Sequence, residues 1–133
     1  MKITNTELIN AYLGLNFLGK EKLPIMLSHQ IESIRSYLEP YAKTVDNMIL
    51  EIKKKYAAVD PVSGDFVRAR SEQGDFLPNT LILENAEEAN KEINEFLIQE
   101  LEIPEVFLKL SEFPSSFTIS ADNLKLIKRI IKL

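Results

Sequence analysis

The chain has 133 residues, 45% hydrophobic and 27% charged, a composition typical of a folded domain rather than a disordered chain. The absence of cysteine excludes disulfide bonds and thiolate metal sites. The net charge of −4 argues against a protein that grips nucleic acid through its phosphates, and is too small for a DNA mimic. No apolar run approaches the roughly 20 residues of a membrane helix. We therefore expect one domain over residues 1–133, with no nucleic-acid or membrane partner.

The start of the chain predicts a short strand followed by a helix. Residues 1–4 have extended character, and Thr4 and Glu7 have the spacing of a capping box, in which side-chain oxygens accept from the free backbone amides of a helix start. The helix is expected over residues 5–18, with Gly19 as its C′ residue. Its apolar residues cover a broad surface, so we expect burial on more than one side.

A second helix is expected over residues 27–57, where apolar residues recur alternately three and four positions apart. This spacing places one side chain per step on a single stripe, as in a coiled-coil seam. Pro40 falls outside the seam and is expected to bend the helix at a cost of about 3 kcal/mol relative to alanine. A break into two helices near Glu39 is the alternative. The seam ladder consists of Ile31, Ile34, Leu38, Tyr41, Val45, Met48 and Ile52.

Residues 58–83 lack the helical spacing of the preceding segment and are rich in turn-forming residues. The segment from Asp60 to Asp65 contains proline, serine and glycine, and β-prone residues flank it on both sides. A bare loop of this length would be unusual in a compact domain, so we expect a small β-hairpin.

A third helix is expected to start at Asn85, whose side chain can cap it, and to end before Pro104. Its apolar spacing matches that of the second helix, which predicts an antiparallel helical hairpin with the β-hairpin at its tip. Ala86 and Ala89 would permit close approach of the two helices.

The rest of the chain predicts a strand and a last helix. Residues 106–110 are expected to form a strand that pairs with residues 1–4, and Ser120 can cap a helix through residue 132. The expected fold class is α+β, mainly α: a helical hairpin with a β-hairpin at its tip, an N-terminal helix, a short β pairing of the termini and a C-terminal helix.

Few residues could carry catalysis. His29 is the single histidine and is expected on the outer face of the second helix, without the cysteine or serine motif of nucleophilic catalysis. The acidic residues of the third helix, Glu92 among them, are expected on a solvated face opposite Ile93. There is no glycine-rich phosphate loop. We therefore expect a protein that is not an enzyme, with no catalytic residue, cofactor or metal.

Two groups of residues are candidates for contact with a partner. Four cations in the predicted last helix would form a basic amphipathic face, although cations are also common at helix C-termini because the helix dipole favours them. Apolar residues in the turn-rich segment could form a contact surface on the β-hairpin or pin the hairpin to its own helices. The candidates are Lys125, Lys128, Arg129 and Lys132 in the first group, and Phe66, Phe76 and Leu77 in the second.

Two stretches of the chain resemble short uncharacterised proteins of tailed bacteriophages. The likeness covers about half of the chain, in pattern more than in identity, and residues 60–83 depart from it. Its parts are MKITNTEL at 1–8, LNFLGK at 15–20, KLP at 22–24, EI at 102–103, VFLKL at 106–110, FP at 113–114 and TIS at 118–120, which leads into Leu124. The resemblance implies a phage or prophage origin and expression in the cytoplasm of a host bacterium, and it supplies no catalytic residues.

The function expected from these observations is that of a non-catalytic phage protein that binds another protein, such as an inhibitor of a bacterial defence system or a modulator of host machinery. The alternative is a virion component, such as a tail accessory protein or an assembly chaperone. The apolar flanks of the predicted helical hairpin are also compatible with a homo-oligomer.

Overall fold

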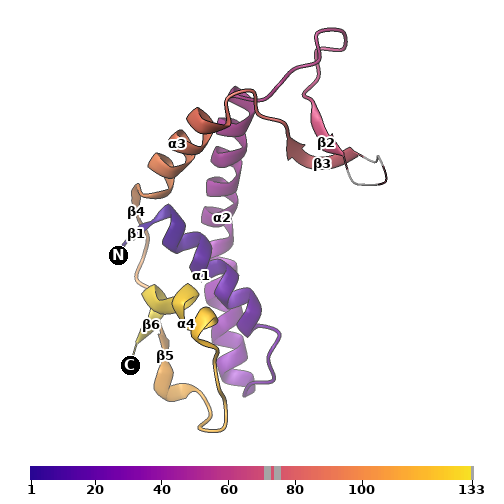
Figure 1. Cartoon of the computed structure of the whole chain (residues 1–133). Coiled ribbons are helices and arrows are strands. Elements are labelled where there is room, and N and C mark those ends of the chain that lie inside the picture. The colour runs from indigo at the N-terminus through magenta and orange to yellow at the C-terminus, as the bar shows by residue number, and fades with distance from the viewer. Residues whose placement is uncertain (71–72, 74–75, 133) are drawn as a thin grey trace. The chain divides into compact units, whose positions relative to one another are not determined.

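The structure, a computed structural model, describes residues 1–70, 73 and 76–132, with the backbone alone at 68–70 and 76–80. The predicted fold class is confirmed: the chain is α+β and mainly α (Figure 1). Contacts divide it into two compact units. Unit 1 comprises residues 1–45 and 97–133, and unit 2 comprises residues 46–96. The expectation of a single domain stays a prediction. The four α-helices of the described residues are α1 (Asn5–Leu18), α2 (Ile25–Lys55), α3 (Ala86–Leu97) and α4 (Ala121–Ile127).

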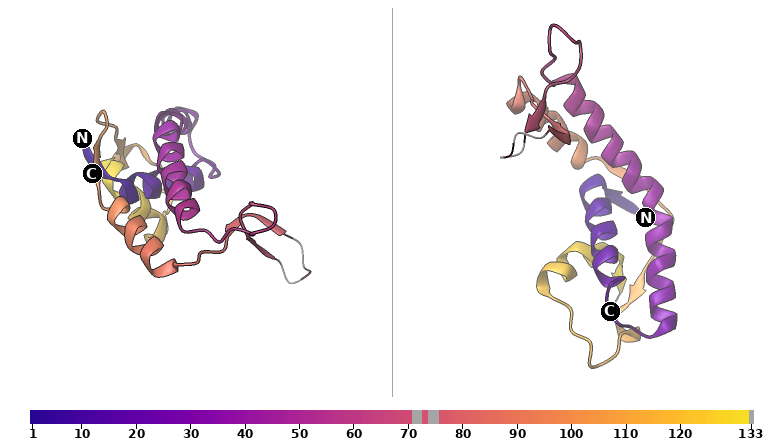
Figure 2. Two further views of the ribbon diagram at one scale, coloured as in Figure 1. Left: turned by 90° about the horizontal axis from the view of Figure 1, so that it is seen from above. Right: turned by 90° about the vertical axis from the view of Figure 1, so that its right-hand side faces the viewer.

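Helix α1 lies at the centre of unit 1, beside the first part of α2 and against α4 (Figures 1 and 2). The predicted capping box is confirmed, because the Thr4 hydroxyl accepts from the Glu7 amide and the Glu7 carboxylate accepts from the Thr4 amide. The helix ends at Leu18, as predicted, and Gly19 directly follows it as the C-cap residue, with φ −63° in the right-handed region.

A close approach of α1 and α4 depends on Gly14, a position that the sequence analysis did not single out. A Cβ atom at Gly14 would lie 2.3 Å from the Ile127 Cγ2 atom, closer than real side-chain atoms pack. Ile127 is fully buried in this contact. The missing side chain of Gly14 is therefore what lets the two helix backbones meet.

Helix α2 runs without a break through Pro40, so the continuous helix is correct and the break near Glu39 is not. Pro40 is exposed, as expected, and its carbonyl accepts a hydrogen bond from the Thr44 hydroxyl at 2.9 Å. The seam is narrower than the ladder predicts. Every second residue of the ladder is buried. Of the residues between them, Ile34 and Tyr41 are half-buried and Met48 is 47% exposed. The buried residues of the ladder are Ile31, Leu38, Val45 and Ile52.

The strand pairing of unit 1 differs from the prediction. Strand β1 (Lys2–Thr4) pairs in antiparallel fashion with β4 (Glu100–Glu102), and not with residues 106–110. The segment that was predicted to pair with β1 contains β5 (Leu108–Lys109), which pairs in parallel with β6 (Ile131–Lys132) instead. Residues 100–103 alternate glutamate with an apolar residue, the period of a strand with one buried face. The observed pairing places Leu101 opposite the buried Ile3.

The last helix is shorter than predicted. Its cap is confirmed, because the Ser120 hydroxyl accepts from the Asn123 amide at 3.1 Å. Helix α4 then ends at Ile127, followed by a 3-10 turn and by β6, so the predicted helix through residue 132 is wrong. The chain tightens into the 3-10 helix Lys128–Ile130, and the backbone becomes extended only at Ile131, where β6 begins.

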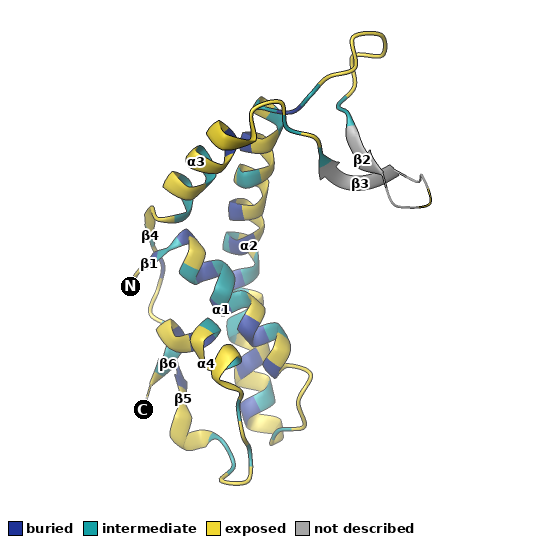
Figure 3. Ribbon diagram, viewed as in Figure 1, coloured by how far each residue is buried: buried dark blue, intermediate teal, exposed yellow. Residues whose placement is uncertain are grey.

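Unit 2 consists of the end of α2, a β-hairpin and α3 (Figure 1). The hairpin is β2 (Arg68–Arg70) with β3 (Phe76–Leu81), and the predicted turn before it is confirmed by the Asp60 carboxylate, which accepts from the Val62 amide. Helix α3 begins at the predicted Asn85 cap. Of the two alanines expected to allow close packing, Ala89 is buried and Ala86 is exposed (Figure 3). Ala86 is therefore too early in α3 to face the end of α2.

Candidate protein-binding site

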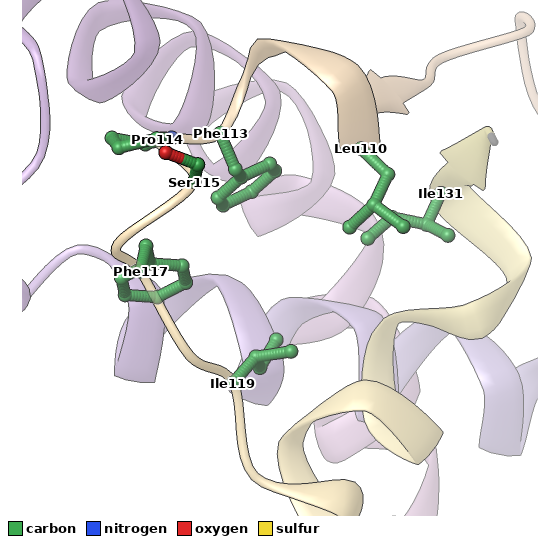
Figure 4. Close-up of a pocket in the computed structure, with 7 residues that line it drawn as sticks. All are labelled: Leu110, Phe113, Pro114, Ser115, Phe117, Ile119 and Ile131. Carbon is green, nitrogen blue, oxygen red and sulfur yellow. The ribbon is translucent and has the colours of Figure 1, made fainter.

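Unit 1 contains an apolar pocket of about 230 Å³, built on the loop that precedes α4 (Figure 4). Its walls combine the short 3-10 helix Leu110–Glu112, the following loop and one residue of β6. None of the lining side chains is charged, so the pocket favours an apolar group. The lining residues are Leu110, Phe113, Pro114, Ser115, Phe117, Ile119 and Ile131.

Two backbone turns hold the aromatic walls of this pocket in place. The Phe113 amide donates to the Leu110 carbonyl at 3.1 Å, and the Phe117 amide donates to the Pro114 carbonyl at 2.9 Å. The second turn folds the chain back so that the Phe113 and Phe117 rings stack, with centroids 5.5 Å apart and planes at 25°. Because this arrangement uses short-range hydrogen bonds, the pocket is shaped before any ligand enters.

A second hollow, with a volume of about 360 Å³, adjoins the first and shares Phe117 and Ile119 with the apolar pocket. It is more polar, since Glu21 and Asn123 belong to its walls. Together the two hollows form a surface with an apolar end and a polar end. Such a combination suits a protein segment that presents one apolar side chain beside polar ones.

The predicted basic face does not form on one helix. Lys125 and Lys128 are exposed, but Arg129 pairs with the Glu7 carboxylate at 3.1 Å and donates to the Lys2 carbonyl. The Lys132 ammonium lies 4.5 Å from the Phe107 ring centroid, on β6. The four cations are thus spread over α4, a 3-10 turn and a strand, and two of them have partners within unit 1.

The second group of candidate residues belongs to unit 2. Phe66 is half-buried and its backbone bridges to Val59, which favours a role in holding the hairpin together. The side chains of Phe76 and Leu77 lie outside the described residues, so their predicted contact role stays a prediction.

In unit 2, Glu92 is at the centre of a polar cluster. The Tyr56 hydroxyl donates to Glu92 Oε2 at 2.6 Å, and the Lys55 ammonium lies 3.1 Å from Oε1. Donation by Tyr56, and then by Lys55, lowers the pKa of Glu92, and the same contacts raise the pKa values of Tyr56 and Lys55. Glu92 was expected on a solvated face. It is instead half-buried and ties α3 to the end of α2.

This cluster holds a single engaged carboxylate, so its geometry is that of a structural tie. Glu88 and Glu95 line the same hollow of about 250 Å³ as Glu92 and are exposed, whereas Glu92 is held by Tyr56 and Lys55. Within the described residues, no group of three or more metal-ligating side chains comes together. His29 is exposed on α2, as expected.

The pocket residues were missed by the sequence analysis, although the segment from Pro114 to Ser116 has the composition of a turn. The available signal was Phe113 and Phe117, two aromatic residues four positions apart on either side of that turn. A turn of this length returns the chain on itself, so flanking aromatics can stack. Ile131 could not be found in this way, because it reaches the pocket through the parallel β5–β6 pairing.

Comparison with protein-family models, curated proteins and solved structures found no match to this chain. The resemblance to phage proteins therefore stays a prediction. Among the helices of the described residues, none combines the length and the apolar character needed to cross a membrane.

Proposed function

We propose that this chain is a non-catalytic protein that binds another protein through the apolar pocket of unit 1. The observation that carries the proposal is the stacked pair Phe113 and Phe117 at the wall of an open, uncharged pocket. Aromatic and aliphatic pockets of this kind receive the anchor side chains that dominate the energy of protein interfaces.

The volume of the apolar pocket, about 230 Å³, is sufficient for one apolar side chain of a partner. One leucine or phenylalanine side chain of a partner is a suitable occupant. The polar hollow beside it, with Glu21 and Asn123, would receive the neighbouring residues of the same partner segment.

A peptide-display selection tests the proposal whatever the identity of the partner. Random peptides are selected on the intact protein, and enriched peptides are then measured against Leu110→Lys and Leu50→Lys. Leu110 and Leu50 are both 36% exposed, but only Leu110 lines the pocket. We expect enriched peptides to share an apolar anchor and to bind Leu110→Lys at least about tenfold more weakly, a loss of about 1.4 kcal/mol.

Equal binding to both variants would place the peptide site elsewhere and contradict the proposal. Retained binding by Leu50→Lys shows that a new lysine on the surface does not by itself weaken the peptide. Thermal melting of both variants confirms that they are folded.

The resemblance to phage proteins makes a bacterial protein of the host the partner to test first, as expected for an inhibitor of a defence system or a modulator of host machinery in the host cytoplasm. Purified complexes should contain the chain and one host protein in a 1:1 ratio. Detection of the chain in purified virions by mass spectrometry would favour the virion component instead.

A further inference from the structure

The polar hollow differs from the apolar pocket beside it because one of its walls carries a charge. The two hollows share Phe117 and Ile119, which lie on the loop that leads into α4, so their occupants would be neighbours (Figure 4). Among the described residues that line these two hollows, Glu21 alone is charged. Its side chain is exposed, and within the described part of the chain no hydrogen bond or ion pair engages its carboxylate.

The loop between α1 and α2 fixes the backbone of Glu21 at the polar hollow. The Lys20 amide donates to the Phe17 carbonyl at 3.2 Å, and the Glu21 amide donates to the Leu18 carbonyl at 3.1 Å. Leu18 is buried and belongs to the wall of the same hollow. The position of Glu21 is therefore set by unit 1, whereas its carboxylate remains accessible to a partner.

The charged residues that line the hollows of this surface are acidic, although cations are close in the chain. The Lys20 ammonium lies 5.8 Å from the Phe17 ring centroid, and Lys22 is exposed and lines neither hollow. A third hollow of unit 1, of about 310 Å³, is lined by Glu112, which belongs to the 3-10 helix that also forms a wall of the apolar pocket. The charge presented by these walls is therefore negative.

We infer that the partner segment is basic: it places an apolar side chain in the pocket and, within two positions of it, a lysine or arginine that pairs with Glu21. This inference rests on the proposed function. Side chains two positions apart in an extended segment project from the same side, as two adjoining hollows require. A carboxylate attracts a cation and repels an acidic side chain, so charge complementarity selects this class of segment over a neutral or acidic one.

Asn123 offers the same segment a contact that does not depend on its sequence. The side chain of Asn123 is half-buried in the wall of the polar hollow, while its backbone amide is used by the Ser120 cap. A side-chain amide both donates and accepts, so it can hydrogen-bond to the backbone of an extended segment. The preference for a cation therefore depends on Glu21.

The peptides selected on the wild-type chain test the inference, with Glu21→Gln and Glu105→Gln as matched variants. Both glutamates are exposed residues of unit 1, but only Glu21 lines the hollow, and each substitution removes one negative charge. We expect the enriched peptides to carry lysine or arginine within two positions of the apolar anchor. Glu21→Gln should weaken their binding about two- to fivefold, less so at high salt, and Glu105→Gln should leave it unchanged.

A charge swap sharpens this test. In the swapped peptide, glutamate replaces the cation beside the anchor, and this peptide should bind Glu21→Lys more tightly than the wild type, while the original peptide shows the reverse order. Glu105→Lys changes the net charge by the same amount and should not reproduce the swap. An equal swap at Glu105 would mean that only net charge acts, and would overturn the inference. Thermal melting confirms that the lysine variants are folded.

Two further outcomes would overturn the inference and leave the proposed function in place. These are enriched peptides with an apolar anchor but no cation beside it, and equal binding by Glu21→Gln and Glu105→Gln, in either case with binding still weakened by Leu110→Lys. Unimpaired binding by Leu110→Lys, or a selection that enriches no peptide, would overturn the proposed function and the inference together.

Discussion

Unit 1 and unit 2 are stabilised by different kinds of interaction. All ten of the largest fully buried side chains belong to unit 1, among them Leu8, Leu38 and Ile127. In unit 2 the described core consists only of Ile52, Ala57 and Ala89. Among the described residues, backbone pairing and the polar contacts of Glu92 also stabilise unit 2. Since hydrophobic burial provides most of the stabilising free energy of a fold, unit 1 should set the global stability.

The two units also differ in net charge. Unit 2 contains eleven acidic and six basic residues, whereas unit 1 contains nine acidic and ten basic residues. The net charge of the chain, −4, therefore resides in unit 2. The candidate pocket therefore belongs to the nearly neutral unit, which also contains most of the described core.

The largest effect is expected from the core of unit 1. Leu38→Ala removes a fully buried side chain and should lower the free energy of unfolding by about 2–5 kcal/mol. Met48→Ala, on the same ladder but 47% exposed, should change it by no more than about 0.5 kcal/mol. Urea denaturation of both variants measures this difference. Similar losses of unfolding free energy at Leu38 and Met48 would mean that all residues of the ladder are equally buried.

A smaller effect is expected at the α1–α4 contact. Gly14→Ala places a methyl group against Ile127 and should cost about 1–3 kcal/mol of unfolding free energy, reduced by the better helix propensity of alanine. Gly19→Ala is the control, because the nearest atom to its Cβ would lie at an acceptable 3.4 Å and its backbone is right-handed. The control should be neutral or slightly stabilising. Equal stability of the two variants would contradict the close packing of α1 and α4.

Removing the N-cap side chain of a helix in each unit compares how much each helix contributes to the stability of the chain. Thr4→Ala removes the cap of α1 and should lower the global free energy of unfolding by about 1 kcal/mol. Asn85→Ala removes the cap of α3, and we expect its effect mainly as faster amide hydrogen exchange within α3. Exchange measured by mass spectrometry distinguishes the two. If Asn85→Ala lowered global stability as much as Thr4→Ala, the chain would unfold as one cooperative domain.

The smallest effect concerns the pH dependence of unit 2. Because the pKa of folded Glu92 lies below its ordinary value of 4.5, its ionised form stabilises unit 2 above that pH. This contribution is lost as the pH falls through the lowered pKa. The protection of α3 against hydrogen exchange, taken relative to the intrinsic exchange rate at each pH, should therefore fall on acidification in the wild type, and less in Glu92→Gln. Glu95→Gln, an exposed control on the same helix, should retain the wild-type acid response.

Much of the local structure could be predicted because it depends on neighbours in the chain. The capping box of Thr4 and Glu7, the Asn85 and Ser120 caps and the turn at Asp60 each use hydrogen bonds that span four residues or fewer. The bounds of α1 follow from such signals. The sequence left open whether α2 continues through Pro40 or breaks near Glu39; the ladder, which keeps one register on either side of Pro40, favoured the continuous helix that the structure has.

The tertiary structure alone decided which strands pair, where α4 ends and where a pocket forms. β1 has two apolar candidates as partner, and only burial of Ile3 in the assembled unit selects β4 over residues 106–110. Ile131 lines the pocket only because β6 pairs with β5. Contacts between distant residues depend on the competition among all apolar surfaces of the chain at once, and local spacing carries no record of that competition.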